Sequence, residues 1–190
     1  MVLEILLQWQ HLDSIITAKI IERQIHTMDK LEKLFLAMID YEKEVPSRIQ
    51  HLTKVHSFAR LIGLAEGLDE ETQYILEATA YAHDIGIKPS YEKYGHCKGP
   101  FQEKEGVEPA KKLLGELGFE EKVIERVCWL IAHHHTYTDV VGIDYQILLE
   151  ADFLVNLFED NEDKTAIKAA YEKIFKTETG KHICKTMFGI

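Results

Sequence analysis

Residues 79–86 read Thr79-Ala80-Tyr81-Ala82-His83-Asp84-Ile85-Gly86. Apolar residues recur with helical spacing from Tyr74 to Ile85, and no alternating run indicates a strand. Asp69 stands where an N-cap would begin the helix that we expect over residues 69–86. His83 and Asp84 are therefore polar side chains in positions where a helical core pattern requires apolar ones.

The same helical spacing continues on both sides of this stretch, with glycine and proline residues between the segments. Residues 87–100 hold two glycines and two prolines, so we expect a loop there. Helices are predicted over about 3–25, 28–43, 46–64, 69–86, 101–117, 119–135, 143–159, 163–175 and 178–188. The sequence therefore predicts an all-α fold.

Composition limits the classes of function. Hydrophobic residues make up 46% of the 190 residues, which is enough for a packed core. The 22 basic and 32 acidic side chains give a formal net charge of −10, which argues against binding to nucleic acid or to an anionic membrane surface. No signal peptide and no membrane span is expected, and the three separated cysteines suggest a reduced, cytoplasmic protein.

Four places put metal-binding side chains on buried helical faces: His51, the pair at residues 83 and 84, the run 133–135 and Asp152. Asp152 lies among leucines, alanine and phenylalanine, where an unpaired carboxylate costs several kcal/mol. One such residue alone is more often a satisfied core residue than a ligand. Four in one small helical chain favour a divalent transition ion, because imidazole nitrogens and carboxylate oxygens suit Zn, Mn, Fe, Ni or Co.

Spacing cannot show that these residues meet, but their order resembles a known family. A histidine, then His-Asp, then a distant aspartate is the pattern of the HD superfamily of metal-dependent phosphohydrolases, which have an all-helical fold. The resemblance covers roughly residues 45–160. It implies an HD-domain helical bundle with additional N- and C-terminal helices. We expect residues 1–44 to form an N-terminal helical extension and residues 45–190 to form the HD domain with its C-terminal helices.

The resemblance also implies a site and a reaction. One divalent transition ion (Mn, Fe, Co, Ni or Zn) would be bound by the set His51, His83, Asp84 and Asp152. The ion would lower the pKa of a bound water from 15.7 to about 7, giving a hydroxide that attacks phosphorus. Asp84 would also orient or deprotonate that water.

The sequence departs from the dinuclear members of the superfamily. Their additional histidine appears here as Gln102, four residues before Gly106, and glutamine is a poor ligand for a transition ion. His134 best continues the buried stripe of the preceding helix, so one further ligand is kept. We therefore expect one metal ion, with a second as the alternative. His133 and His134 would then face a substrate phosphate or supply a proton, with Gln102 on the substrate side.

Other cationic side chains are candidates for binding phosphate. Arg48 precedes His51 by three residues, so both lie on one helical face. A salt bridge to Glu44 or another acid is the alternative role of Arg48. Lys88 belongs to a locally basic segment, 88–100, which would form a lid or simply a solvated loop. The Gly-Tyr-Pro sequence of the cyclic-dinucleotide phosphodiesterases is absent after His135.

The expected function is hydrolysis of a small phosphorylated molecule, a nucleotide or another phosphomonoester. Two alternatives remain. Some HD-fold proteins hold two irons and oxidise C–H bonds, and this chemistry needs the fuller histidine set. The chain could instead be a non-catalytic module that binds a metal or a nucleotide. The N-terminal helices would pack onto the domain or form a homodimer.

Overall fold

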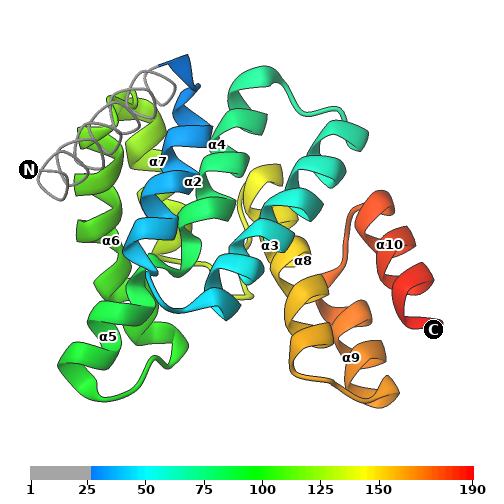
Figure 1. Ribbon diagram of the computed structural model, residues 1–190. Coiled ribbons are helices and arrows are strands. Elements are labelled where there is room, and N and C mark those ends of the chain that lie inside the picture. The colour runs from blue at the N-terminus through cyan, green and yellow to red at the C-terminus, as the bar shows by residue number, and fades with distance from the viewer. Residues whose placement is uncertain (1–26) are drawn as a thin grey trace, which may run out of the picture.

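The computed structural model describes residues 27–190, and every regular element in that range is helical (Figure 1). The helices are α2 (Lys30–Tyr41), α3 (Pro46–Ala65), α4 (Glu70–Ala82), the 3₁₀ turn η1 (His83–Gly86), α5 (Ile87–Tyr94), α6 (Gly99–Glu116), α7 (Glu121–Ile131), α8 (Ile143–Glu159), α9 (Lys164–Ile174) and α10 (Glu178–Phe188). The predicted all-α fold is confirmed. Within the described range, no helix has the length and apolar character needed to span a membrane.

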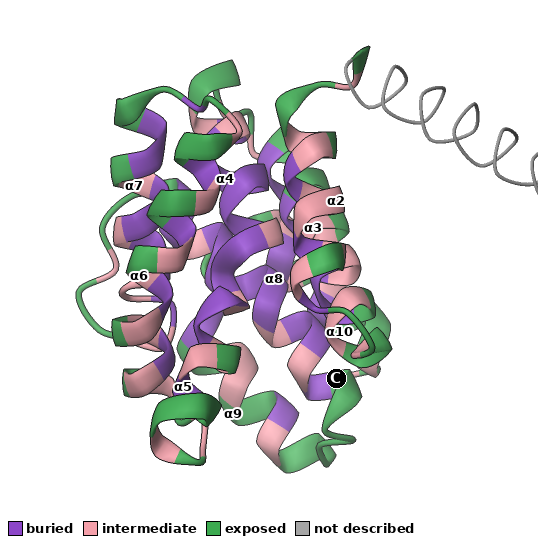
Figure 2. Cartoon of the chain, turned by 60° about the vertical axis from the view of Figure 1, so that its left-hand side comes forward, coloured by how far each residue is buried: buried purple, intermediate pink, exposed green. Residues whose placement is uncertain are grey.

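The centre of the molecule is formed by α3, α4 and α8, with α6 and α7 on one side and α9 and α10 on the other (Figure 1). Figure 2 shows that buried residues concentrate on α4 and α8, while the outer helices are buried on one face only. The fully buried core includes Val55, Ala59, Ile62, Leu76, Leu130, Ile147 and Leu154. Burial of each large side chain stabilises the fold by about 1.5–3 kcal/mol. The core thereby fixes α3, α4 and α8 beside one another.

The segments outside this centre are attached by specific contacts. In α2, Leu34 and Met38 are fully buried in the same core. At the other end of the chain, the buried carboxylate of Glu150 on α8 accepts hydrogen bonds from the backbone N–H groups of Lys176 and Thr177, at 2.6 and 2.9 Å. The predicted helix at 3–25 lies outside the described residues, and so does the dimer contact expected of it. The division at residues 44 and 45 stays a prediction.

The prediction of a loop over residues 87–100 was wrong for most of that segment. α5 covers residues 87–94, and α6 already begins at Gly99. Pro89 and Pro100 lie in the first turns of these helices, where a backbone N–H has no partner within the helix and proline is tolerated. Gly95 ends α5 with a φ of 74°, a left-handed conformation that suits glycine. The connecting loop is therefore confined to residues 95–98.

The helix predicted over 69–86 is α-helical only as far as Ala82. Asp69 caps its N-terminus, as predicted, by accepting a hydrogen bond from the backbone N–H of Thr72 at 2.9 Å. His83 and Asp84 lie in the following 3₁₀ turn. The two residues therefore follow the end of α4 rather than lying on its last turn.

Gly86 lets the backbone of this turn approach α6 closely. A Cβ atom at position 86 would lie 2.2 Å from the backbone oxygen of Gln102 and 2.9 Å from the backbone nitrogen of Gly106. We expect Gly86→Ala to lower the free energy of unfolding by about 3 kcal/mol, since neither backbone can move away freely. Urea denaturation of the two proteins measures this difference.

Gly115→Ala is the matched control, because a Cβ atom at position 115 in the same α6 meets nothing within 4 Å. This change should be neutral or stabilise the protein by about 0.5–1 kcal/mol. Equal stability of Gly86→Ala and the wild type would contradict the close approach of η1 and α6.

Candidate metal centre

Three elements bring the four predicted ligands together. His51 comes from the second turn of α3, His83 and Asp84 from η1, and Asp152 from the middle of α8. The side chains of His51, His83 and Asp152 are at most 9% exposed, and Asp84 is 16% exposed. The cluster therefore lies at the C-terminal end of α4, enclosed by helices with one side open to solvent.

The distances within the cluster match those between ligands of a single ion. His51 Nε2 lies 3.2 Å from Asp152 Oδ1 and 3.3 Å from His83 Nε2. The distances to Asp84 are 3.6 Å from His51 Nε2 and 3.7 Å from His83 Nε2. Two ligand atoms bound to one ion at about 2.1 Å lie roughly 3.0–3.5 Å apart. The two closest pairs fall within that range, and the contacts of Asp84 slightly exceed it. Ligand atoms of His51, His83 and Asp84 all lie within 4.8 Å of one another, a group that could hold a metal ion, and Asp152 Oδ1 lies beside both histidines.

The histidine tautomers point to the same conclusion. The Nδ1–H of His51 donates to Glu159 Oε2 at 2.9 Å, and that of His83 donates to the backbone oxygen of Ala80 at 3.0 Å. When Nδ1 carries the hydrogen, Nε2 of a neutral imidazole presents a lone pair. If both rings are neutral, their Nε2 lone pairs face each other at 3.3 Å beside Oδ1 of the buried Asp152, and this arrangement is repulsive. A cation among these atoms would satisfy all of them, so the residues fit a metal ion.

The charges of the cluster favour a cation as well. Burial acts to raise the pKa of Asp84 and Asp152, but the facing histidines outweigh it and hold both values below the ordinary range. Burial acts to lower the pKa of His51, but the hydrogen bond and the charge of Asp152, together with the charge of Asp84, raise it from 6.5 to about 9. Both carboxylates therefore stay ionised at neutral pH, and in the metal-free protein His51 holds a proton.

This proton makes metal binding dependent on pH. Because an incoming ion must displace it, we expect the affinity of the metal-free protein for Mn²⁺ to rise by up to about tenfold per pH unit between roughly pH 6.5 and 9. At pH 7, binding should release at least about one proton per ion. Calorimetric titration in buffers of different ionisation enthalpy measures the release. An affinity that is constant over this range would contradict the assignment of His51 as a ligand.

A second group of possible ligands adjoins the first. His134 Nε2 lies 3.6 Å from Asp84 Oδ1, is buried and has no hydrogen-bond partner, while its Nδ1–H donates to the backbone oxygen of Ile131 at 2.7 Å. Asp84, His134 and His135 have ligand atoms within 4.8 Å of one another. Of the three consecutive histidines, His134 is thus the one directed at the HD pair.

Gln102 engages one ring nitrogen of His135. The side-chain amide of Gln102 donates to the backbone oxygen of Cys97 at 2.5 Å, and its Oε1 lies 3.2 Å from Nε2 of His135. Since an amide oxygen only accepts, His135 Nε2 carries the hydrogen in this contact and presents no lone pair. Burial and the neighbouring His134 lower the pKa of His135 to about 4, so it stays neutral. Both polar ends of Gln102 are occupied, which does not favour its predicted contact with substrate.

The open side of the centre is a small polar hollow of about 190 Å³. It is lined by Ser47, Arg48, His51, Asp84, Asn156 and Glu159. Arg48, predicted to bind phosphate, forms an ion pair with Glu42 at 2.9 Å. The alternative of a salt bridge is therefore also present, with Glu42 in place of Glu44. The guanidinium group lies where a ligand entering the hollow would meet it.

Two predicted substrate residues are held elsewhere. The ring of His133 stacks on Trp129, with centroids 4.2 Å apart, and its Nδ1–H donates to the backbone oxygen of that residue. The Lys88 ammonium lies over the ring of Tyr41, 5.2 Å from its centroid, and 3.5 Å from the Tyr41 backbone oxygen. These contacts do not favour a phosphate-binding role for either residue, and that role stays a prediction.

Three residues of the hollow were missed by the sequence analysis: Ser47, Asn156 and Glu159. Asn156 and Glu159 follow Asp152 by four and seven residues on α8, so the three share one helical face. This polar stripe on an otherwise apolar helix was the available signal. It was not recognised because Glu159 comes at the predicted end of the helix, where a charged residue is usually solvated.

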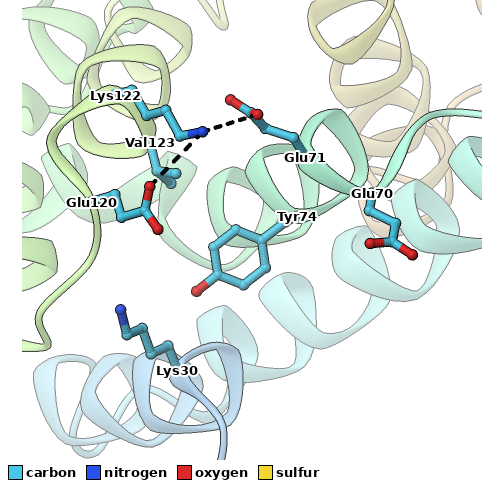
Figure 3. Close-up of a pocket in the computed structure, with 7 residues that line it drawn as sticks. All are labelled: Lys30, Glu70, Glu71, Tyr74, Glu120, Lys122 and Val123. Atoms are coloured by element: carbon cyan, nitrogen blue, oxygen red, sulfur yellow. Dashed lines mark ion pairs between the residues drawn. The ribbon is translucent and has the colours of Figure 1, made fainter.

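A larger hollow, of about 570 Å³, lies at the opposite end of α4 (Figure 3). Three of its charged groups pair with one another: Lys122 lies 3.0 Å from Glu71 and 3.8 Å from Glu120. None of the four converging ligands reaches it. The smaller hollow beside Asp84, and not this larger one, therefore adjoins the candidate ligands.

Comparison with known proteins agrees with this geometry. No curated protein matches the chain. The chain is similar to the crystal structure of a "predicted HD superfamily hydrolase" from an uncultured Thermotogales bacterium. The two sequences are 24% identical, and the match covers 89% of this chain and 91% of that one, with a TM-score of 0.61. This similarity shows a common fold. The sequence model of the HD domain matches residues 48–157, more than half of the chain, and this segment includes all four converging ligands. The chain therefore belongs to the HD domain family.

Proposed function

We propose that this protein is a metal-dependent phosphohydrolase that acts on a small phosphorylated molecule. The observation that carries the proposal is that Nε2 of His51 and Nε2 of His83 each lie within 3.7 Å of Asp84 and within 3.6 Å of Asp152, beside an open polar hollow. Membership of the HD domain family supports a hydrolase with a divalent metal ion. The nature of the substrate is inferred from the hollow alone.

We infer one ion per chain, held by His51, His83, Asp84 and Asp152. When bound, the ion supplies a Lewis acid for activating water and for neutralising phosphoryl charge. A second ion would need His135, whose Nε2–H is engaged by Gln102. The contact between Gln102 and His135 therefore favours the mononuclear centre.

The remaining residues have separate tasks. Asp84 lies within 3.7 Å of both His83 Nε2 and His134 Nε2. Its carboxylate therefore lies between the proposed ion site and the imidazole of His134. His134 Nε2 presents a lone pair towards Asp84 and is placed to accept a proton from water or to return one to the leaving group. Arg48 would bind the phosphate with its guanidinium group, exchanging part of its ion pair with Glu42.

The size of the hollow supports a phosphomonoester. A volume of about 190 Å³ admits a phosphate group and the first atoms attached to it, and the rest of the substrate would lie over the rim. A terminal phosphate enters such a site more easily than a bridging phosphodiester. The protein as a whole is acidic, so Arg48 and the ion would supply the local positive charge that a phosphate requires.

A phosphatase screen over nucleotides and other phosphomonoesters tests this function. The protein is stripped of metal and reconstituted separately with Mn²⁺, Co²⁺ and Ni²⁺. We expect release of inorganic phosphate from at least one monoester, abolished by chelation and restored by the ion. Metal-loaded protein that hydrolyses none of these compounds would contradict the proposal.

The oxygenase alternative depends on the second ligand group. Asp84, His134 and His135 are close enough to contribute to a second ion site if the contact between Gln102 and His135 opens and a further ligand joins them. Two irons per chain in the isolated protein, together with consumption of dioxygen, would support that alternative over the phosphohydrolase.

A further inference from the structure

The three histidines of the centre are oriented in two different ways. His83 and His134 each donate Nδ1–H to a backbone oxygen three residues earlier, so their own turns fix the rings. His51 instead donates to the carboxylate of Glu159, which belongs to another helix. Among the predicted histidine ligands of the described chain, His51 thus depends on a distant side chain for its orientation.

Glu159 is placed for this contact by the geometry of α8. It follows Asp152 by two helical turns, so a ligand and the partner of a ligand lie on one face. Its Oε2 accepts from His51 at 2.9 Å, and its Oε1 accepts from Lys54. Lys54 is three residues after His51 on α3. One carboxylate therefore contacts two side chains of the facing helix at the edge of the metal centre.

We propose that Glu159 is a positioning residue for His51, and that it raises the affinity of the centre for its ion; this inference rests on the proposed metal site. A carboxylate on Nδ1–H fixes the tautomer in which Nε2 is free, holds the ring towards the ion and increases the basicity of Nε2. Lys54 occupies the other carboxylate oxygen, which keeps Glu159 turned towards α3.

The alternative is that Glu159 merely ties two helices together. The Glu159 and Lys54 side chains are 30% and 36% exposed, and exposed ion pairs contribute little to stability. A structural tie would affect unfolding of the metal-free protein. A positioning role would change the affinity for the ion and the spectrum of the bound ion. Measuring affinity and unfolding together therefore distinguishes the two roles.

The test compares wild type, Glu159→Ala, Glu159→Gln and the control Glu162→Gln, whose side chain is exposed three residues away. The affinity for Co²⁺ is measured by competition with a chelator, together with the absorption spectrum of bound Co²⁺ and the thermal unfolding of the metal-free proteins. We expect Glu159→Ala to weaken Co²⁺ binding about 10- to 100-fold and to alter the spectrum. Glu159→Gln should lose less Co²⁺ affinity than Glu159→Ala, because the amide oxygen of glutamine still accepts a hydrogen bond from Nδ1–H of His51. Glu162→Gln should match the wild type.

A Co²⁺ affinity of Glu159→Ala within about twofold of wild type would overturn the inference, and a lower unfolding temperature with unchanged affinity would identify a structural tie instead. These results leave the proposed function intact. A wild type that binds Co²⁺ tightly and hydrolyses no phosphomonoester would remove the proposed function and leave the role of Glu159 standing. A wild type that binds no Co²⁺ would overturn both.

Discussion

Replacing His83 or Asp84 by alanine should remove most of the bound metal and all measurable turnover. His83 is 1% exposed, and its Nε2 faces Asp152 at 3.6 Å, so no other side chain can take its place. Asp84 contacts both histidine ligands and His134. The ion supplies several kcal/mol of transition-state stabilisation, so its loss corresponds to a decrease of roughly 10³-fold or more in kcat/KM. Metal content and phosphatase activity of the same preparations measure the effect.

Asp84→Asn provides the more stringent variant, because it keeps the shape and removes the charge. Asp160→Asn, an exposed acid just after α8, is the matched control and should keep metal and activity. Unfolding curves identify any variant that fails to fold. Full metal occupancy in both His83→Ala and Asp84→Ala would rule out the ligand assignment.

Replacing Gln102 by histidine should raise the metal content from about one towards two ions per chain. Position 102 is buried beside His135, and the second group of Asp84, His134 and His135 lacks one good ligand there. Histidine at 102 would end the amide contact that occupies His135 Nε2 and would add an imidazole nitrogen. Elemental analysis of the purified variant, compared with wild type, measures the change.

Gln102→Leu is the control for the loss of the two amide hydrogen bonds without a new ligand. It should release His135 but leave the metal content near one per chain. If the metal content of Gln102→His also stays near one ion per chain, the neighbouring residues do not form a second metal site. An equal rise in Gln102→Leu would show that His135 and His134 alone suffice once Gln102 is removed.

Most of the fold follows from local patterns. The apolar spacing and the caps, such as Asp69, predict helices because they reflect the burial of one face and the pairing of terminal N–H groups. Proline and glycine were misread at residues 87–100. Proline and glycine break the interior of a helix, but they also occur at its ends. The contacts of α5 and α6 with η1 show that these residues mark helix ends here.

The candidate site was predictable in its membership but not in its geometry. Buried polar residues such as Asp152 are visible in the sequence because they interrupt an apolar face. That they meet could be expected only from the resemblance, since the three elements are far apart in the chain. Glu159, Asn156 and the ion pair of Arg48 with Glu42 depend on how α3 and α8 pack. No local pattern carries that information.

Metal content per chain, measured by elemental analysis of protein purified without an affinity tag, tests the central claim most directly. The four converging ligands and the engaged His135 predict about one transition ion per chain. Protein that contains no metal, and takes up none when Mn²⁺, Co²⁺ or Ni²⁺ is added back, would contradict the metal centre. The histidines and carboxylates would then have to satisfy one another within the core.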